Sequence, residues 1–224
     1  MSKQSDRWLP AFPLGMVLFP GVLVPLHVFE PRYRALTARC LTESIPFGMF
    51  LVRGQAVADI GCEAAVHQVL RTHPDGRSDI LVRGGRRLSM KDAREHADGY
   101  LEALVEPVED AAEEPDPEAF RSLLGLLQDL ERMEAQGQDL PDVPGGGPLA
   151  DASAAIAATP GYTYAIAARL RMDMDDRQTL LETLSEHERE GLLLRTLAQL
   201  LPQARQGIAS RRVVRGNGKP AAAS

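Results

Sequence analysis

The first hundred residues alternate short apolar runs with turn residues, and this pattern strongly constrains the fold. Pro20-Gly21, Pro74-Asp75-Gly76 and Gly84-Gly85 separate several of the runs, and such residues favour turns between strands. The predicted strands cover residues 16–19, 22–24, 47–52, 62–70, 80–83, 88–90 and 100–105. Many short strands at this spacing predict a small, partly closed β-barrel.

One helix is predicted within this β-rich half. Pro31 occupies a favourable first helical position after Glu30, and Tyr33, Leu36 and Cys40 recur at helical spacing. We expect the helix to span residues 31–43.

The composition changes after Pro107. Residues 102–118 contain eight acids and no base, and nothing apolar enough for a strand follows until Pro117. We therefore expect a barrel domain over residues 8–108 and an acidic linker over 109–116.

The last third of the chain has helical periodicity. Phe120, Leu123, Leu127 and Leu130 form one apolar stripe, which predicts a helix over about 117–135. A glycine-rich loop is expected over 141–148, and further helices from Pro160, over about 176–184, and over 185–202. The predicted class is α+β: a β-barrel with one helix, then a helical bundle over 117–204 and a disordered basic tail over 205–224.

Charge and hydropathy exclude several functions. The net charge is −6, but residues 203–224 carry five basic groups and no acid, so the remainder carries −11 and repels polyanions. No apolar run is long enough for a membrane span, and the first residues do not resemble a secretory signal. A cytoplasmic location is expected, with Cys40 and Cys62 as reduced packing residues.

Residues 14–33 read LGMVLFPGVLVPLHVFEPRY. This segment strongly resembles the opening of the Lon protease N-terminal, substrate-binding domain family. Further similar segments follow in the family's order: PFG at 46–48, GC at 61–62, ILVRG at 80–84, YLEA at 100–103 and RQTLLE at 177–182. The resemblance extends over about residues 9–202.

The resemblance implies a PUA-like pseudobarrel followed by a helical bundle, a domain that helps to capture unfolded substrates for an ATPase and a peptidase. The phosphate-binding motif of an ATPase is absent, because the one Gly-Lys pair is followed by Pro220. None of the three lysines lies in a context that matches a Ser-Lys peptidase. We therefore expect a stand-alone, non-catalytic module that binds unfolded or partner protein segments, with a separate protease or chaperone as a further partner.

The most distinctive polar and aromatic residues lie in one segment. A peptide-binding interpretation makes them part of a cleft, whereas a structural one has Phe29 buried and Glu30 capping the helix and pairing with an arginine. Arg83 is either that arginine or a ligand contact. The candidate peptide-binding residues are Pro25, His27, Phe29, Glu30, Arg32, Tyr33 and Arg83.

Other chemistry finds little support. The spacing of Cys62, His67 and His73 fits no compact zinc pattern, and the acids at 173–176 lack the remainder of an EF-hand. No G-x-S-x-G elbow occurs, so neither catalytic residues, metal nor cofactor is predicted. The alternative function is RNA binding, because PUA-like barrels are also used to bind RNA and the tail is basic.

Overall fold

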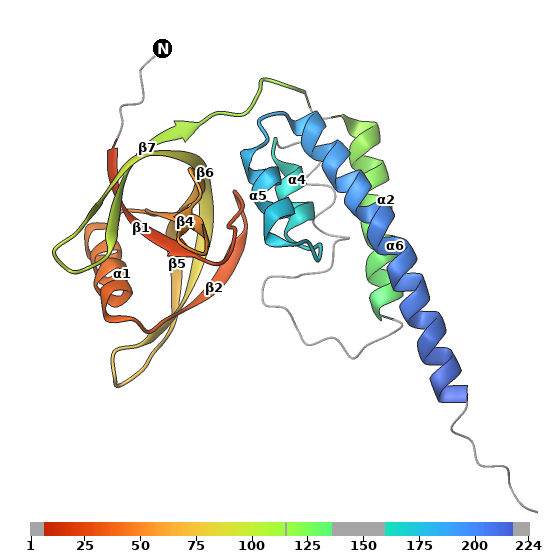
Figure 1. The fold of residues 1–224 in the computed structure, drawn as a ribbon, viewed down its shortest axis with the longest axis horizontal. Helices are drawn as coiled ribbons and strands as arrows, with labels where there is room; N and C mark the ends of the chain where they lie inside the picture. Colours follow the sequence, from red (N-terminus) through yellow and green to blue (C-terminus); the bar gives the residue numbers. More distant parts are fainter. Residues whose placement is uncertain (1–6, 115, 136–159, 217–224) are drawn as a thin grey trace, which may run out of the picture. The chain divides into compact units, whose positions relative to one another are not determined.

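The computed structural model describes residues 7–114, 116–135 and 160–216 (Figure 1). The chain forms two compact units. The first contains residues 1–113 and 161–186, and the second contains residues 114–160 and 187–224.

A closed β-barrel forms most of the first unit. Strand β1 pairs antiparallel with β7 and parallel with β3, which joins the two ends of the order β1-β7-β6-β5-β3. Strand β2 pairs with the first part of β6, and β4 with β3 (Figure 1). The α+β class with a β-barrel is confirmed. The strands are β1 (Arg7–Leu14), β2 (Leu23–Val28), β3 (Phe47–Arg53), β4 (Ala56–Val57), β5 (Ile60–Thr72), β6 (Ser78–Glu95) and β7 (Leu101–Val108).

The first predicted hairpin is wrong. Residues 16–19 do not form a strand, and the chain instead enters the barrel earlier through β1. Pro20-Gly21 is a turn, in which the Val22 amide donates to the Phe19 carbonyl at 3.2 Å and Gly21 has φ of 76°. The turn leads from β1 to β2, but these strands pair with different partners.

The predicted turn at Gly84-Gly85 is also wrong, because β6 runs through both glycines. The Gly84 amide donates to the Val22 carbonyl, and the Gly84 carbonyl accepts from the Gly21 amide, both at 2.9 Å. A Cβ on Gly84 would overlap the Phe19 carbonyl oxygen. Glycine at this position lets the turn at residues 19–22 approach β6 closely, since glycine within a strand often marks a site where another backbone comes near.

Helix α1 (Pro31–Glu43) has the predicted bounds. Tyr33, Leu36 and Cys40 face the barrel core, where the Tyr33 ring stacks on Phe12 with centroids 4.0 Å apart. Cys40 and Cys62 are unpaired and buried in this core, and burial raises the pKa of the Cys62 thiol to about 12.

Two short helices belong to the barrel unit, α4 (Tyr162–Ala167) and α5 (Met174–Glu182). The domain boundaries expected from the sequence place them with the bundle. Buried Arg87 on β6 donates to the carbonyls of Leu181 and Thr183 at 2.8 and 2.9 Å and pairs with Asp110 at 2.6 Å. The Gln178 amide also donates to the Ile60 carbonyl at 2.8 Å. These polar contacts, which join positions far apart in sequence, hold α5 and the segment after it to the barrel.

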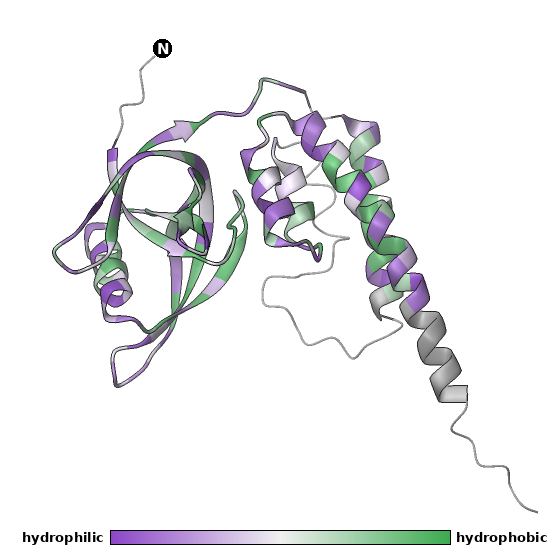
Figure 2. Ribbon diagram, viewed as in Figure 1, coloured by the Kyte–Doolittle hydropathy of each residue, from purple (hydrophilic) through white to green (hydrophobic). Residues whose placement is uncertain are grey.

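The second unit contains α2 (Pro117–Ala135) and all but the first residue of α6 (Glu186–Gly216). Helix α2 carries both apolar and polar residues (Figure 2), as expected for an amphipathic helix. The buried residues are Phe120, Leu123, Leu127 and Leu130 of α2 and Leu193 and Leu197 of α6.

The predicted end of the last helix is wrong, because α6 continues through Pro202 to Gly216 and residues 205–216 are helical. Proline inside a helix removes one hydrogen bond and costs roughly 3 kcal/mol. The leucines before it and the glutamine, alanine and arginine residues after it favour helix and offset part of that cost. The loop predicted at 141–148 and residues 217–224 lie outside the described residues. None of the helices in the described part of the chain is long and apolar enough to cross a membrane.

Replacing Arg87 with methionine should lower the free energy of unfolding by about 2–4 kcal/mol, since the buried Leu181 carbonyl and the part-buried Thr183 carbonyl lose a charged donor. Urea denaturation at pH 7 measures this loss. Exposed Arg86 offers the matched control, for which Arg86→Met should change stability by less than about 0.5 kcal/mol. Equal stability of the two variants would contradict the role assigned to Arg87.

Candidate functional site

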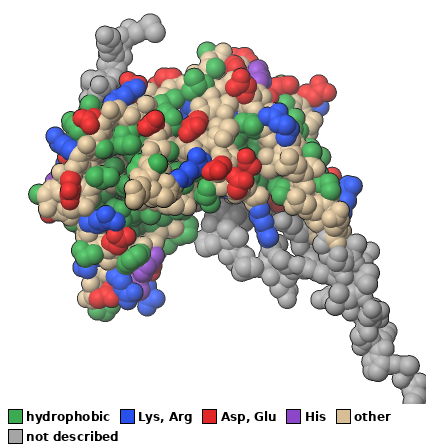
Figure 3. All heavy atoms as spheres, viewed as in Figure 1, with side chains coloured by type: hydrophobic (Ala, Val, Ile, Leu, Met, Phe, Trp, Pro, Cys, Tyr) green, Lys and Arg blue, Asp and Glu red, His purple; other side chains and the backbone are tan. Residues whose placement is uncertain are grey.

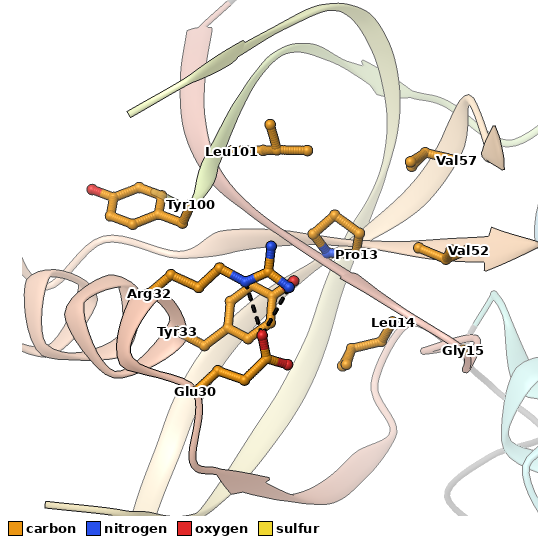
Figure 4. Close-up of a pocket in the computed structure, with 10 residues that line it drawn as sticks. All are labelled: Pro13, Leu14, Gly15, Glu30, Arg32, Tyr33, Val52, Val57, Tyr100 and Leu101. Carbon is orange, nitrogen blue, oxygen red and sulfur yellow. Dashed lines mark hydrogen bonds and ion pairs between the residues drawn. The ribbon is translucent and has the colours of Figure 1, made fainter. Parts of the chain in front are cut away.

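A hollow of about 390 Å³ opens in the barrel unit beside the start of α1 (Figure 4). Its wall comes from the end of β1, the N-terminal turn of α1, strands β3 and β4, and the start of β7. The lining residues are Pro13, Leu14, Gly15, Glu30, Arg32, Tyr33, Val52, Val57, Tyr100 and Leu101.

Three of the predicted site residues line this hollow together. The Glu30 carboxylate accepts from the Arg32 side chain at 2.8 and 2.9 Å, and the Arg32 guanidinium lies 4.6 Å from the Tyr33 ring centroid (Figure 4). Glu30 is the residue before the helix, but its side chain makes no capping hydrogen bond. Burial raises the pKa of Tyr33, with Arg32 lowering it and Glu30 raising it by smaller amounts. The Glu30–Arg32 ion pair therefore lies beside the hollow, with the Arg32 guanidinium packed over the Tyr33 ring.

Tyr100 forms a second aromatic part of the wall and is held by charged neighbours. Its ring stacks on His96 at 4.4 Å, and its hydroxyl accepts from Arg39 of α1 at 3.0 Å. Arg39 also donates to the Glu102 carboxylate at 2.8 Å, and Arg94 donates to the same carboxylate at 2.7 Å. This network fixes β7 against α1 and β6 on one side of the hollow.

The remaining predicted residues lie elsewhere. Pro25, His27 and Phe29 are exposed along one side of β2 and just after it, and Arg83 is exposed on β6 opposite Leu23. Phe29 is 58% exposed, so the structural interpretation that buried its ring is wrong. The arginine that pairs with Glu30 is Arg32, two residues away, and not Arg83.

Sequence reasoning missed the residues that supply most of the apolar wall. Pro13, Leu14 and Gly15 come from the end of a strand that the periodicity did not reveal, although Leu14 and Gly15 begin the segment singled out above. Val52, Val57 and Leu101 lie on strands that meet α1 only through barrel closure. Nothing in their local sequence marks them as neighbours of Arg32.

The arrangement is suited to holding an apolar group. Five of the lining residues are aliphatic side chains or proline, and the one charged pair is satisfied internally. No serine, cysteine, threonine, lysine or histidine is among the lining residues.

The family model for the ATP-dependent protease La (LON) substrate-binding domain matches residues 8–199. Relatives include Lon protease of Parabacteroides distasonis, 26% identical over 139 residues, and Lon protease of Brevibacillus choshinensis, 27% identical over 214 residues. These matches cover 58% and 87% of this chain, but only 16% and 25% of those proteins.

Solved structures show the same architecture. A Lon N-terminal domain protein from Xanthomonas campestris is 27% identical with a TM-score of 0.64, covering 84% of this chain and 98% of that one. The N-terminal domain of Mycobacterium avium complex Lon protease has a TM-score of 0.65 at 21% identity, covers 86% and 98%, and shows the fold alone. A closed barrel of this kind followed by helices defines the class as a Lon-type N-terminal domain. The chain belongs to the Lon substrate-binding domain family.

The Glu102 network makes the free energy of unfolding depend on pH. Burial acts to raise the pKa of Glu102, but hydrogen bonds from Arg39 and Arg94 outweigh it and the pKa is lowered from 4.5. The stabilisation is therefore present above pH 4.5 and is lost as the pH falls through the folded-state pKa. At pH 7 Glu102→Gln should cost about 1–2 kcal/mol of unfolding free energy, and the difference from wild type should shrink below pH 4.5.

Chemical denaturation of the wild type and of Glu102→Gln between pH 3 and pH 8 measures this dependence. This range roughly brackets the pH at which carboxyl groups titrate. Exposed Glu95 on β6 provides the control, and Glu95→Gln should leave the profile of the wild type unchanged. A Glu102→Gln deficit that is the same at every pH would contradict the assignment.

Proposed function

We propose that this chain is a non-catalytic module that binds unfolded or extended protein segments, with an apolar side chain of the segment seated in the hollow. The observation that carries the proposal is the hollow with an apolar wall beside Glu30, Arg32 and Tyr33, which lies within the residues that match the family model. The family is described as the substrate-binding domain of a protease, which supports the protein-binding class, and the hollow offers a place for a bound segment.

The size and lining of the hollow support this role. Binding pockets in proteins commonly measure roughly 300–1,000 Å³ and combine apolar walls with a few polar groups. At about 390 Å³, this one accommodates one large apolar side chain rather than a folded surface. Such a seat selects for apolar character and not for one sequence, which suits recognition of unfolded chains.

The charged pair at the hollow supplies the polar part of recognition. The side chains of Glu30 and Arg32 are 38% and 50% exposed, so both remain accessible to a bound peptide. A carboxylate accepts from backbone amides and a guanidinium donates to backbone carbonyls, which every peptide carries. Tyr33, buried and stacked on Phe12, keeps this pair in place.

The proposal separates the module from the activity of the whole Lon relatives. The chain spans between 16% and 25% of the length of the curated relatives described above, and the matched family model is a substrate-binding domain. Proteolysis and ATP hydrolysis are therefore assigned to other polypeptide segments or proteins, and a separate protease or chaperone is the proposed partner. A cytoplasmic location remains a prediction.

Filling the hollow tests the seat. Gly15 is exposed, lines the hollow, has no positive φ, and a Cβ there would meet nothing within 4 Å. Gly15→Trp should therefore fold normally while occupying the space, and it should weaken binding of fluorescein-labelled casein, an unfolded polypeptide, at least tenfold, equivalent to about 1.4 kcal/mol. Fluorescence anisotropy at two salt concentrations measures the affinity.

Gly125 on α2 provides the matched control, since a Cβ there also meets nothing within 4 Å and Gly125→Trp adds the same ring outside the hollow. Gly15→Ala, which adds little volume, should bind like wild type. Equal casein affinity for Gly15→Trp and wild type would overturn the hollow as the seat. Binding of single-stranded RNA that falls steeply with salt and disappears on truncation before Arg205 would favour the alternative function.

A further inference from the structure

Two histidines and an aspartate meet at the end of the barrel where β2, β5 and β6 come together. In the strand register His27 of β2 lies opposite Asp79 of β6, and Arg71 of β5 lies opposite the same aspartate on the other side. His73 follows the end of β5, in the turn that leads to β6. Figure 3 shows histidine beside basic side chains near this end of the barrel. None of the three residues lines the hollow described above.

The ligand-forming atoms of these residues converge. The His27 Nδ1 atom lies 2.6 Å from one carboxylate oxygen of Asp79, and the His73 Nε2 atom lies 3.0 Å from the other. One nitrogen from each histidine and a carboxylate oxygen lie within 4.8 Å of one another. Two ligands bound to one zinc ion at about 2.0–2.1 Å are themselves roughly 3 Å apart, so little movement brings this set onto an ion.

We propose that His27, His73 and Asp79 form a site for a divalent transition-metal ion of the zinc type. Two imidazole nitrogens with one carboxylate are a donor set that zinc accepts, with the fourth position left to water or to a ligand from a partner. The site goes beyond the proposed peptide-binding hollow, because it shares no residue with the hollow and takes a different class of ligand.

The backbone around the cluster holds the ligands in place. His27 and Asp79 are fixed by the pairing of β2 with β6. The amide of His73 donates to the Arg77 carbonyl at 2.8 Å, and the Gly76 amide donates to the His73 carbonyl at 2.9 Å, which closes the turn. The φ of 84° at Gly76 suits glycine in this position. The donors are therefore positioned by strands and a tight turn and not by a loose loop.

The charge of the surroundings sets the expected strength. The three proposed ligands comprise one carboxylate, Asp79, and two imidazoles. Arg77 pairs with Asp75 at 2.7 Å, which offsets its charge beside the site. With three protein ligands, His27 exposed, and arginines nearby, the site should bind zinc more weakly than a closed four-ligand structural site.

Titration of the full chain tests the site. The protein, purified without a polyhistidine tag and treated with EDTA, is titrated with ZnCl₂ by calorimetry at pH 7.5. Saturable binding of one ion per chain is expected, and His73→Ala and Asp79→Asn should each weaken it at least tenfold. His67→Ala is the matched control, because His67 is exposed on β5, the strand that leads to His73, but lies outside the cluster, and this variant should bind zinc like wild type.

A spectroscopic measurement on the unmodified protein guards against misfolded variants. Co²⁺ added in place of Zn²⁺ should give visible absorption bands of a protein-bound ion, which stoichiometric Zn²⁺ removes. Absence of saturable zinc binding, or an equal loss in His67→Ala and His73→Ala, would overturn the site. In that outcome the aspartate serves only to hydrogen-bond the two imidazoles and to hold the hairpin to β2.

Discussion

Closure of the barrel by β1 is the constraint on which the rest of the first unit depends. This strand pairs with β7 on one side and with β3 on the other, so it joins the start of the chain to segments about forty and ninety residues away. Closure removes two sheet edges and places Pro13, Leu14 and Gly15 opposite the first turn of α1. The hollow exists because β1 ends where α1 begins to cover the barrel.

Buried and half-buried charges then attach the remaining elements to this frame. The Glu102 carboxylate accepts hydrogen bonds from Arg39 of α1 and Arg94 of β6. Arg87 holds α5 and the segment after it by donating to backbone carbonyls. Each of these interactions is specific in direction, whereas apolar packing alone tolerates many arrangements. The two proposed sites differ in their chemistry: the hollow offers apolar surface for a peptide, and the cluster of His27, His73 and Asp79 offers nitrogen and oxygen donors.

Local rules predicted well the elements whose signals are local. Pro31 and the spacing of Tyr33, Leu36 and Cys40 gave the bounds of α1, and the turn at Pro74-Asp75-Gly76 was also predicted. The errors occurred where one residue type has two meanings. Gly84 was interpreted as a turn, but it admits the neighbouring turn to the surface of β6, and Pro202 was interpreted as a helix end, but α6 continues past it. For Gly84, the packing partner Phe19 distinguishes the two roles.

The sequence by itself determined the α+β class, the helix at 31–43 and the family, and it singled out three of the residues that line the hollow. These features were accessible because periodicity, turn chemistry and the segment at 14–33 are properties of residues close together in the chain. Tertiary structure alone decided that Phe29 is exposed and that residues 161–186 belong to the barrel unit. It also brought His27 within hydrogen-bonding distance of Asp79, 52 residues later. Strand pairing across the barrel joins residues whose separation in sequence carries no signal, so these neighbours become visible only once the chain has folded.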